Sequence, residues 1–435
     1  MPSVADPRDP QRACRIAVIG AGYVGLTTAA GFAHVGHTVR VGEADPDRLD
    51  ALVRGLVPVA EPELADLVTA GAAAGRLFFD ADNSAAAAGA DAVFVAVPTP
   101  EGDDGAVDLS FVLQALDQVA DSLGPGTPLV IKSSIPPGTW EQLQARLDDL
   151  GCSASLVINP EFLQEGRAVE DVLNPRRILV GGQDRAAVDL VAEIHHPFAA
   201  PIIRTGPSSA ELAKYASNAY LATRLTFVNT LAHLAEAFGA DVGDVLDVLA
   251  HDPRIGPHYL RPGPGYGGSC FPKDVRALVA AAGKRGHDLG LLRSVVQAND
   301  DQLDRVVAKV RDAVGTLQGA VVALLGLAFK GGTADVRGSP AVALAERLVA
   351  AGAAVRAYDP AARVEIPGME QVADAVAAAT GADAVLVATE WDEFAAIDPV
   401  SLAAVMRGTT VVDARNLLDR DAVRAAGLEY RGLGR

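Results

Sequence analysis

The feature that most constrains the fold is a glycine-rich segment near the N-terminus. Residues 15–20 (RIAVIG) are a short β-branched run, and Gly20-Ala-Gly-Tyr-Val-Gly25 follows at once. A small-residue stretch to about Val35 predicts a helix, and residues 38–43 (TVRVGE) predict a second strand that ends in an acid. Strand, G-x-G-x-x-G, helix, strand and acid in this order are typical of a dinucleotide-binding βαβ unit.

Each glycine of this motif has its own expected role. Gly20 allows a tight turn, Gly22 lets the backbone approach a pyrophosphate, and Gly25 lets the helix pack closely on the strand. The N-terminus of the helix then faces the phosphates. Glu43 is expected to accept hydrogen bonds from the adenosine ribose and to repel a 2′-phosphate, which favours NAD over NADP. The alternative is an ordinary βαβ turn that binds no ligand.

The chain contains an internal repeat. Residues 89–96 (GADAVFVA) recur as residues 381–388 (GADAVLVA), in the same order relative to the first strand of each half. The repeat predicts an α/β protein with two Rossmann-like doubly wound domains, joined by a long central helix and a small helical domain. The expected boundaries are a tail at 1–13, an NAD-binding domain at 14–197, a helical and dimerisation domain with the cysteine loop at 198–314, and a second Rossmann-like domain at 315–435. Because the second copy lacks the glycine motif, we expect it to bind a different ligand or none.

The central helix can be placed from its end signals. Ser208 and Glu211 have the spacing of a capping box, with Ser208 as the N-cap. Residues 209–238 contain no proline or glycine, and Gly239 is a suitable stop. Apolar residues lie around much of this helix, which suggests burial against neighbouring domains or a second subunit. We therefore expect a homodimer that forms through the central helix.

Composition and charge exclude several classes of function. The net charge of −18 argues against a nucleic-acid binder and against a polybasic membrane-surface protein. No apolar run approaches the ~20 residues that span a bilayer, and the first residues carry no apolar leader. The three cysteines suggest neither a disulfide framework nor a zinc site, so we expect a cytoplasmic protein without a metal. Lysine is scarce: only six of the 37 basic residues are lysine.

The segment richest in chemical signals is the loop at 261–274 (RPGPGYGGSCFPKD). Its glycines and prolines predict a shaped loop, and Pro272 suits the first position of a helix. Cys270 would then precede a helix N-terminus with Lys273 nearby, and both features favour the thiolate. A cysteine nucleophile beside an NAD domain suggests covalent catalysis on a carbonyl.

Other candidates lie at strand ends and on the central helix. Lys214 and Asn218 are four residues apart and share a helix face, with a solvated surface pair as the alternative. Glu161 follows an apolar run and could act as a general base; a loop carboxylate without a function is the alternative. Lys132, Ser133 and Ser134 likewise follow an apolar strand at 128–131.

Together these segments resemble the UDP-glucose/GDP-mannose dehydrogenase family, from about Arg15 to Leu418. The forms at 159–166 and 254–256 look like the members that act on UDP-glucose. The resemblance rests on GAGYVGL (20–26), VPTP (97–100), DGAVDLS (104–110), NPEFLQEG (159–166), KYASNAYLA (214–222), RIGPHYLRPGPGYGGSCFPKD (254–274) and LAFKGGTADVRGSP (327–340).

The resemblance implies a four-electron oxidation of a nucleotide-sugar C6 alcohol to a carboxylate with two NAD⁺. The cysteine would form a thiohemiacetal and then a thioester, which water hydrolyses. The alternatives are the same chemistry on another nucleotide sugar (a UDP-N-acetyl-hexosamine or GDP-mannose), a simpler alcohol dehydrogenase that needs no thiol, and a non-catalytic NAD-binding scaffold.

The resemblance also assigns site residues. Lys214 would stabilise the oxyanion, Asp274 and Asn218 would hold that lysine and a water, and Glu161 would move protons. Arg254 would reach a neighbouring subunit. The implied catalytic residues are Cys270, Lys214, Asp274, Glu161, Asn218 and Ser134. The implied cofactor contacts are Gly20, Gly22, Tyr23, Val24, Gly25, Glu43, Arg48, Thr99, Ser134, Glu165, Lys273 and Arg337. The implied substrate contacts are Glu161, Phe162, Leu163, Glu165, Lys214, Asn218, Arg254, Tyr259, Leu260, Arg261, Gly263, Gly267, Lys330 and Arg415.

The sequence departs from the family pattern at four of its positions. Ser134 stands where the family usually has threonine, and Glu43 where it usually has aspartate. Ala334 and Ala414 replace an aspartate and a glycine. These departures affect fine positioning of the site rather than the implied reaction.

Overall fold

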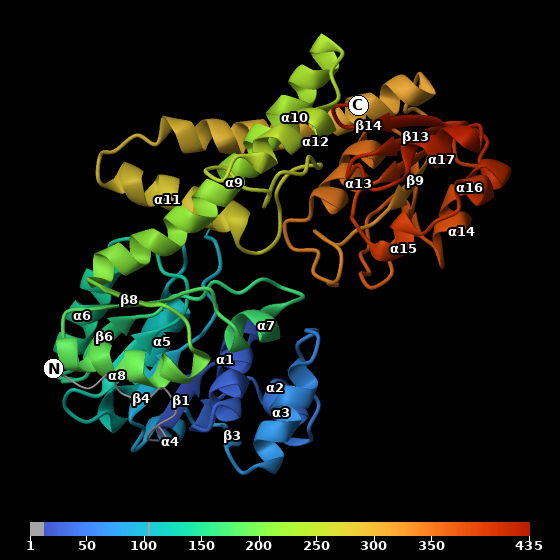
Figure 1. The fold of residues 1–435 in the computed structure, drawn as a ribbon. Helices are drawn as coiled ribbons and strands as arrows, with labels where there is room; N and C mark the ends of the chain where they lie inside the picture. Colours follow the sequence, from blue (N-terminus) through green and yellow to red (C-terminus); the bar gives the residue numbers. More distant parts are fainter. Residues whose placement is uncertain (1–12, 103–104) are drawn as a thin grey trace. The chain divides into compact units, whose positions relative to one another are not determined.

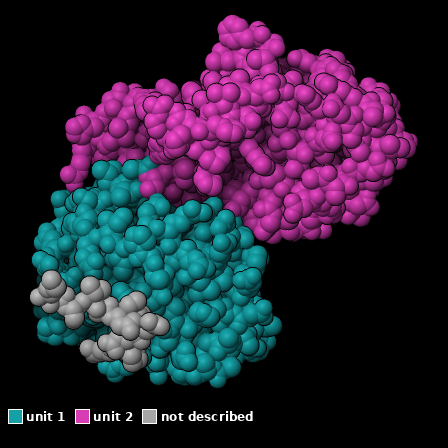
Figure 2. Space-filling model, in the orientation of Figure 1, with its two compact units in different colours: residues 1–216 teal, residues 217–435 magenta. Residues whose placement is uncertain are grey.

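A computed structural model describes residues 13–102 and 105–435, and the chain divides into two compact units (Figures 1 and 2). Unit 1 comprises residues 1–216 and unit 2 residues 217–435. Helix α9 (Pro207–Phe238) contains the boundary between them. No helix in the described ranges is long and apolar enough to cross a membrane.

Unit 1 is built on an eight-stranded sheet of order β3-β2-β1-β4-β5-β6-β7-β8. All neighbouring strands are parallel except β6 and β7, which pair antiparallel. The strands are β1 (Arg15–Ile19), β2 (Thr38–Gly42), β3 (Leu77–Asp80), β4 (Ala92–Val95), β5 (Pro128–Ile131), β6 (Ser155–Ile158), β7 (Ile178–Gly182) and β8 (Ile202–Thr205). The α-helices are α1 (Tyr23–His34), α2 (Pro46–Val53), α3 (Leu64–Ala73), α4 (Asn83–Ala87), α5 (Ser110–Val119), α6 (Thr139–Asp149), α7 (Ala168–Leu173) and α8 (Arg185–His195).

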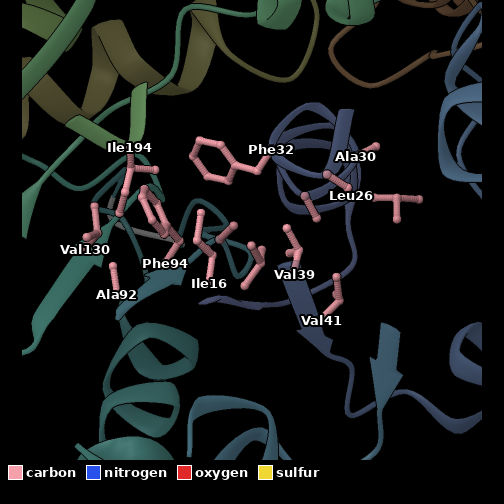
Figure 3. Close-up of a cluster of buried hydrophobic side chains, with 14 of the residues drawn as sticks. Ile16, Leu26, Ala30, Phe32, Val39, Val41, Ala92, Phe94, Val130 and Ile194 are labelled. Carbon is pink, nitrogen blue, oxygen red and sulfur yellow. The ribbon is translucent and has the colours of Figure 1, made fainter. Parts of the chain in front are cut away.

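Both faces of this sheet are covered, as the continuous apolar strands predict. Along β1, Ile16 and Val18 belong to one core cluster, whereas Ala17 and Ile19 belong to another, because successive strand residues point to opposite faces. Figure 3 shows the first cluster, in which Phe32 of α1 packs beside Phe94 of β4. Ala21, just before α1, and Leu26, in its first turn, belong to the same cluster, so the glycine loop is anchored on this face of the sheet.

Unit 2 repeats the same plan with a six-stranded parallel sheet of order β11-β10-β9-β12-β13-β14. The strands are β9 (Val321–Leu325), β10 (Ala354–Tyr358), β11 (Met369–Gln371), β12 (Ala384–Val387), β13 (Thr410–Asp413) and β14 (Glu429–Gly432). The α-helices after α9 are α10 (Val242–His251), α11 (Phe271–Lys284), α12 (Gly290–Val314), α13 (Pro340–Ala350), α14 (Ala375–Ala379), α15 (Asp392–Ala395), α16 (Pro399–Val405) and α17 (Arg420–Ala425). The repeated GADAV segments lead into β4 and β12, which occupy equivalent places in the two sheets. The predicted fold class is confirmed.

The start of α9 differs from the prediction and its end agrees. The helix already includes Pro207, so Ser208 is not its N-cap and the capping-box interpretation is wrong. Proline suits the first helical position, and the Glu211 carboxylate instead accepts hydrogen bonds from the backbone N–H groups of Gly138 and Trp140, at 2.7 and 2.6 Å. At the other end Gly239 has φ +68°, the left-handed conformation of a helix stop.

Candidate active site

The glycine loop between β1 and α1 has the geometry of a ligand cradle. A Cβ atom on Gly25 would lie 1.9 Å from the carbonyl oxygen of Gly20, so only glycine lets α1 approach the strand this closely. Gly20 has φ +98°, a conformation that L side chains rarely adopt. A Cβ on Gly22 would meet nothing within 4 Å, so the backbone at the N-cap of α1 faces open space. These residues fit a dinucleotide, because helix N–H groups and an unobstructed backbone suit a pyrophosphate.

Glu43 lies beside this loop. Its carboxylate is buried and accepts hydrogen bonds from the backbone N–H groups of Ala21 and Asp45, at 2.9 and 2.8 Å. The Arg48 guanidinium adds an ion pair at 3.2 Å. The acid that the sequence predicts for the end of the second strand is therefore oriented toward the glycine loop, with the predicted cofactor residue Arg48 against it.

The equivalent acid of unit 2 is Asp359, which follows β10 and is fully buried. Its two carboxylate oxygens accept five hydrogen bonds from groups of the chain itself. The donors are the backbone N–H groups of Leu327, Ala328, Ala361 and Ala362 and the indole N–H of Trp391. A carboxylate with five donors has no remaining capacity for a ribose. In the second copy, the position that would accept a ribose is therefore filled by groups of the chain itself.

In unit 1, Glu161 and Lys214 form a buried ion pair. The Lys214 ammonium donates to Oε1 of Glu161 at 2.8 Å, and the Leu163 N–H donates to Oε2 at 2.6 Å. Burial alone would raise the pKa of Glu161, but the Lys214 charge and these hydrogen bonds hold it below its ordinary value. The Phe162 ring lies 5.5 Å from the Lys214 ammonium. Since Lys214 and Asn218 are 4% and 7% exposed, the solvated surface pair is excluded.

In unit 2, Cys270 is the N-cap residue of α11 and is exposed. Helix α11 begins at Phe271, so Pro272 occupies its second position rather than its first. Asp274, in the first turn, is 1% exposed and accepts hydrogen bonds from the Asn218 amide at 2.6 Å and from the Lys273 ammonium at 2.8 Å. The positive end of the helix lies next to the thiol, an arrangement that favours a thiolate nucleophile.

The cysteine loop packs against the segment that precedes α13. A Cβ on Gly267 would lie 2.3 Å from the Gly338 carbonyl oxygen, and one on Gly268 2.8 Å from the Phe329 ring. Earlier in the loop, Gly263 donates to the Asn229 side chain and accepts from the Gln302 amide, both at 2.8 Å. The contacts at Gly267 and Gly268 bring the loop together with the segment that carries Lys330.

Arg415 connects three of these segments. Its guanidinium donates to the carbonyl oxygens of Ala388 and Phe329, at 2.9 and 3.1 Å, and a Cβ on Gly263 would lie 3.1 Å from it. Unit 2 thus gathers the predicted substrate residues Gly263, Lys330 and Arg415. Asn229 and Gln302, which hold the loop, were missed by sequence reasoning, because only the fold brings α9 and α12 to Gly263.

The remaining predicted residues lie in local contacts. Arg254 is 87% exposed and pairs with Asp252, and Arg337 pairs with Asp335. The Tyr23 hydroxyl donates to Glu61 at 2.5 Å, and burial followed by this contact raises the pKa of Tyr23. The Ser134 carbonyl accepts from Tyr215 at 3.3 Å. Leu260 is buried, Arg261 is exposed, and Tyr259 has φ +58°. Val24 is the second residue of α1, and Thr99 and Glu165 lie in loops.

Three family models together match most of the chain. The UDP-glucose/GDP-mannose dehydrogenase family NAD binding domain matches residues 14–199, the central domain residues 208–301, and the UDP binding domain residues 323–420. The match of the first model confirms the prediction of NAD as cofactor and excludes the ligand-free βαβ turn.

Similar proteins cover nearly the full length. A UDP-glucose 6-dehydrogenase of Rhizobium meliloti is 41% identical over 97% of this chain and 99% of its own. The UDP-glucose 6-dehydrogenase TuaD of Bacillus subtilis is 38% identical over 97% and 93%. The solved structure of a UDP-glucose dehydrogenase from the archaeon Pyrobaculum islandicum is 35% identical, with a TM-score of 0.91 over 98% of both chains. With matches of this extent, the chain belongs to the UDP-glucose/GDP-mannose dehydrogenase family.

Proposed function

We propose that this chain catalyses the NAD-dependent oxidation of UDP-glucose at C6 to UDP-glucuronate, with Cys270 as the covalent nucleophile. The observation that carries the proposal is the exposed thiol at the N-cap of α11, next to the buried Asp274 with its Asn218 and Lys273 partners. The relatives named as UDP-glucose 6-dehydrogenases support the substrate.

The proposed chemistry has two oxidations. When bound, NAD⁺ supplies the hydride acceptor for each of them. In the first, the C6 alcohol loses its hydroxyl proton to a base, for which Glu161 is our candidate. The Cys270 thiolate then adds to the aldehyde carbon, and the carbonyl oxygen takes up a proton to give a thiohemiacetal. In the second oxidation this hydroxyl loses its proton and the C–S bond is retained as a thioester.

Hydrolysis completes the reaction. Water adds to the thioester carbon, the C–S bond breaks, and the carboxylate and the Cys270 thiol are regenerated. Lys214 would stabilise the oxyanion in this step, as a preorganised cation does in acyl transfer. Asp274 and Asn218 would orient the water, and Ser134 would assist with its hydroxyl. The balance is one UDP-glucose, two NAD⁺ and one water in, and one UDP-glucuronate, two NADH and three protons out.

We assign binding roles by domain. Residues 14–197 would hold NAD through the glycine loop, Glu43 and Arg48. Residues 315–435 would hold the UDP moiety through Lys330 and Arg415, and residues 198–314 would supply the cysteine loop. The reaction needs Cys270 as a free thiol, which a reducing cytoplasm maintains, so we place the protein in that compartment.

We also propose a homodimer that forms through α9. Large apolar side chains stand exposed along this helix at Tyr220, Phe227, Leu234 and Phe238, with exposed fractions of 64%, 55%, 47% and 83%. Their spacing of seven, seven and four residues places them on one stripe of the helix. A second copy of this stripe would cover them. Light scattering should give twice the chain mass for the wild type and the chain mass for Phe227→Asp; a monomeric wild type would contradict the dimer.

The reaction is tested by its stoichiometry. Single-turnover assays with UDP-glucose should yield two NADH per sugar, and Cys270→Ser should abolish complete oxidation to the carboxylate. A panel with GDP-mannose and UDP-N-acetyl-hexosamines tests the alternative substrates. Lack of NADH with UDP-glucose would contradict the proposal, and one NADH per sugar in the wild type would indicate a simple alcohol dehydrogenase. Unchanged substrate from the whole panel would favour the non-catalytic scaffold.

A further inference from the structure

Unit 1 contains a buried lysine to which the proposed reaction gives no role. Lys132 directly follows β5 and is 8% exposed. Its backbone N–H donates to the Val95 carbonyl at 2.9 Å, which fixes it at the carboxyl end of the sheet. Its ammonium donates to Oδ1 of Asn159 at 3.1 Å. A charged group is therefore buried with a neutral amide as its hydrogen-bond acceptor.

Asn159 connects this lysine to Glu161. It directly follows β6, is 1% exposed, and its side-chain amide donates to the Leu179 carbonyl on β7 at 2.7 Å. Its backbone N–H donates to Ile131 at 2.9 Å. Only Pro160 separates Asn159 from Glu161. The contact from Lys132 therefore holds the segment that carries the carboxylate.

The charges around Lys132 form one electrostatic group. Burial lowers the pKa of Lys132 to about 8, while Glu161 attracts its charge and Lys214 repels it. Lys132 in turn contributes to the low pKa of Glu161. The other titratable neighbour is His195 on α8, where burial and then the Lys132 charge lower the pKa to about 3. Two ammonium groups thus flank one carboxylate, with a neutral histidine beside them.

A purely structural role does not account for a lysine here. Burying an ammonium costs free energy, and a hydrophobic side chain of similar volume is often neutral or stabilising in its place. We propose that Lys132 is a positioning residue that acts through Glu161: its Asn159 contact fixes the segment that carries Glu161, and its positive charge adds to that of Lys214 beside the carboxylate. The inference rests on the proposed function, in which Glu161 moves protons.

The kinetic test is a double-mutant cycle between Lys132 and Glu161. Lys132→Met should lower kcat by roughly 10- to 100-fold, because a displaced catalytic group loses about that much. The KM for UDP-glucose should stay within about threefold, since Lys132 would not contact substrate. Lys132→Arg should recover part of kcat. In a Glu161→Gln background, Lys132→Met should change kcat by less than about threefold, because residues that act through one group are non-additive.

A second experiment, by infrared spectroscopy, does not depend on turnover. Infrared difference spectra between wild type and Glu161→Gln isolate the Glu161 carboxylate band. Lys132→Met should raise the pH at which this band is lost, whereas Lys132→Arg should leave it near the wild-type value. The surface variant Lys284→Met is the matched control, because it removes a lysine charge from the end of α11.

The outcomes separate the two proposals. If the wild type makes no NADH from UDP-glucose, the proposed function fails, and the infrared arm alone decides the role of Lys132. If the wild type turns over UDP-glucose but the effects of the two mutations on kcat multiply, Lys132 is structural and the inference is overturned. The same holds if the pH at which the Glu161 carboxylate band is lost does not change. A Lys132→Met variant with wild-type kcat also overturns it.

Discussion

The Asn218 side-chain amide donates a hydrogen bond of 2.6 Å to the carboxylate of Asp274, a residue that is 1% exposed. The second oxygen of the same carboxylate accepts from the Lys273 ammonium at 2.8 Å. One buried anion thus joins the first turn of the cysteine helix to α9. Asp274 therefore orients two side chains that the proposed reaction requires.

Replacing Asp274 by asparagine should show whether the reaction needs the charge of this side chain or only its volume and hydrogen bonding. The variant keeps the volume and one acceptor oxygen, but it leaves Lys273 without its anion. We expect kcat to fall by about 100-fold, the scale of losing one preorganised electrostatic contact. Steady-state kinetics with UDP-glucose and NAD⁺ measure this. Asp288→Asn, which removes a surface carboxylate paired with Arg293, is the control and should leave kcat unchanged. Equal losses in the two variants would contradict the assignment.

Alanine substitutions at Gly22 and Gly25 should affect different properties, NAD⁺ binding in the first case and stability in the second. Gly22→Ala adds a Cβ into open space at ordinary φ, so the fold should survive while the KM for NAD⁺ rises. Gly25→Ala places a Cβ 1.9 Å from a backbone oxygen and should lower stability by about 2 kcal/mol or more. Thermal melting and NAD⁺ titration of each variant distinguish them. A stable Gly25→Ala protein with normal NAD⁺ affinity would refute the close packing.

Lys132 should make stability depend on alkaline pH. Its folded-state pKa is about 8, below the ordinary value of 10.5. Between these values the unfolded chain holds more protons than the folded chain, so the free energy of unfolding rises with pH. From pH 8 to 9.5 the gain should be about 1–2 kcal/mol, at about 1.4 kcal/mol per pH unit. The stability difference between wild type and Lys132→Met should shift in favour of the wild type over this range. A pH-independent difference would contradict a depressed pKa.

Backbone strain predicts a stabilising substitution in unit 1. Ala199 has φ +53°, a left-handed conformation that costs a non-glycine residue about 1 kcal/mol. Ala199→Gly should therefore raise the melting temperature slightly. Gly151, with φ +64° and nothing within 4 Å of a Cβ, is the matched opposite, and Gly151→Ala should lower it. If the melting temperatures of both variants shifted in the same direction, backbone strain would not be what determines stability at these two positions.

Local signals predicted the elements that local physics determines. The β-branched runs gave strands at 15–19 and 38–42, each ending one residue before the predicted end. Gly239 ended the long helix because a left-handed residue is needed there. The internal repeat indicated two sheets of similar order, since the same buried strand recurs in both halves.

Contacts between segments that are distant in the sequence could not be predicted from it. Ser208 and Glu211 match a capping box, but the Glu211 carboxylate bonds to the start of α6, which a local pattern does not reveal. The five donors around Asp359 come from three separate loops. The end of an apolar run and the scarcity of lysine single out Lys132 in the sequence, but its link to Glu161 depends on β5 and β6 lying side by side.

The saturated carboxylate of Asp359 also bears on the order of events during turnover. In the duplicated domain, backbone groups and Trp391 fill the ribose position. Among the described residues this leaves the glycine loop at Gly22 as the dinucleotide cradle, so both hydrides of the proposed reaction would be accepted there. The first reduced cofactor would then have to depart while the half-oxidised sugar stays. The covalent bond to Cys270 would act as the tether that retains the sugar during this exchange, so retention of the intermediate and renewal of the oxidant become separate tasks of the two units.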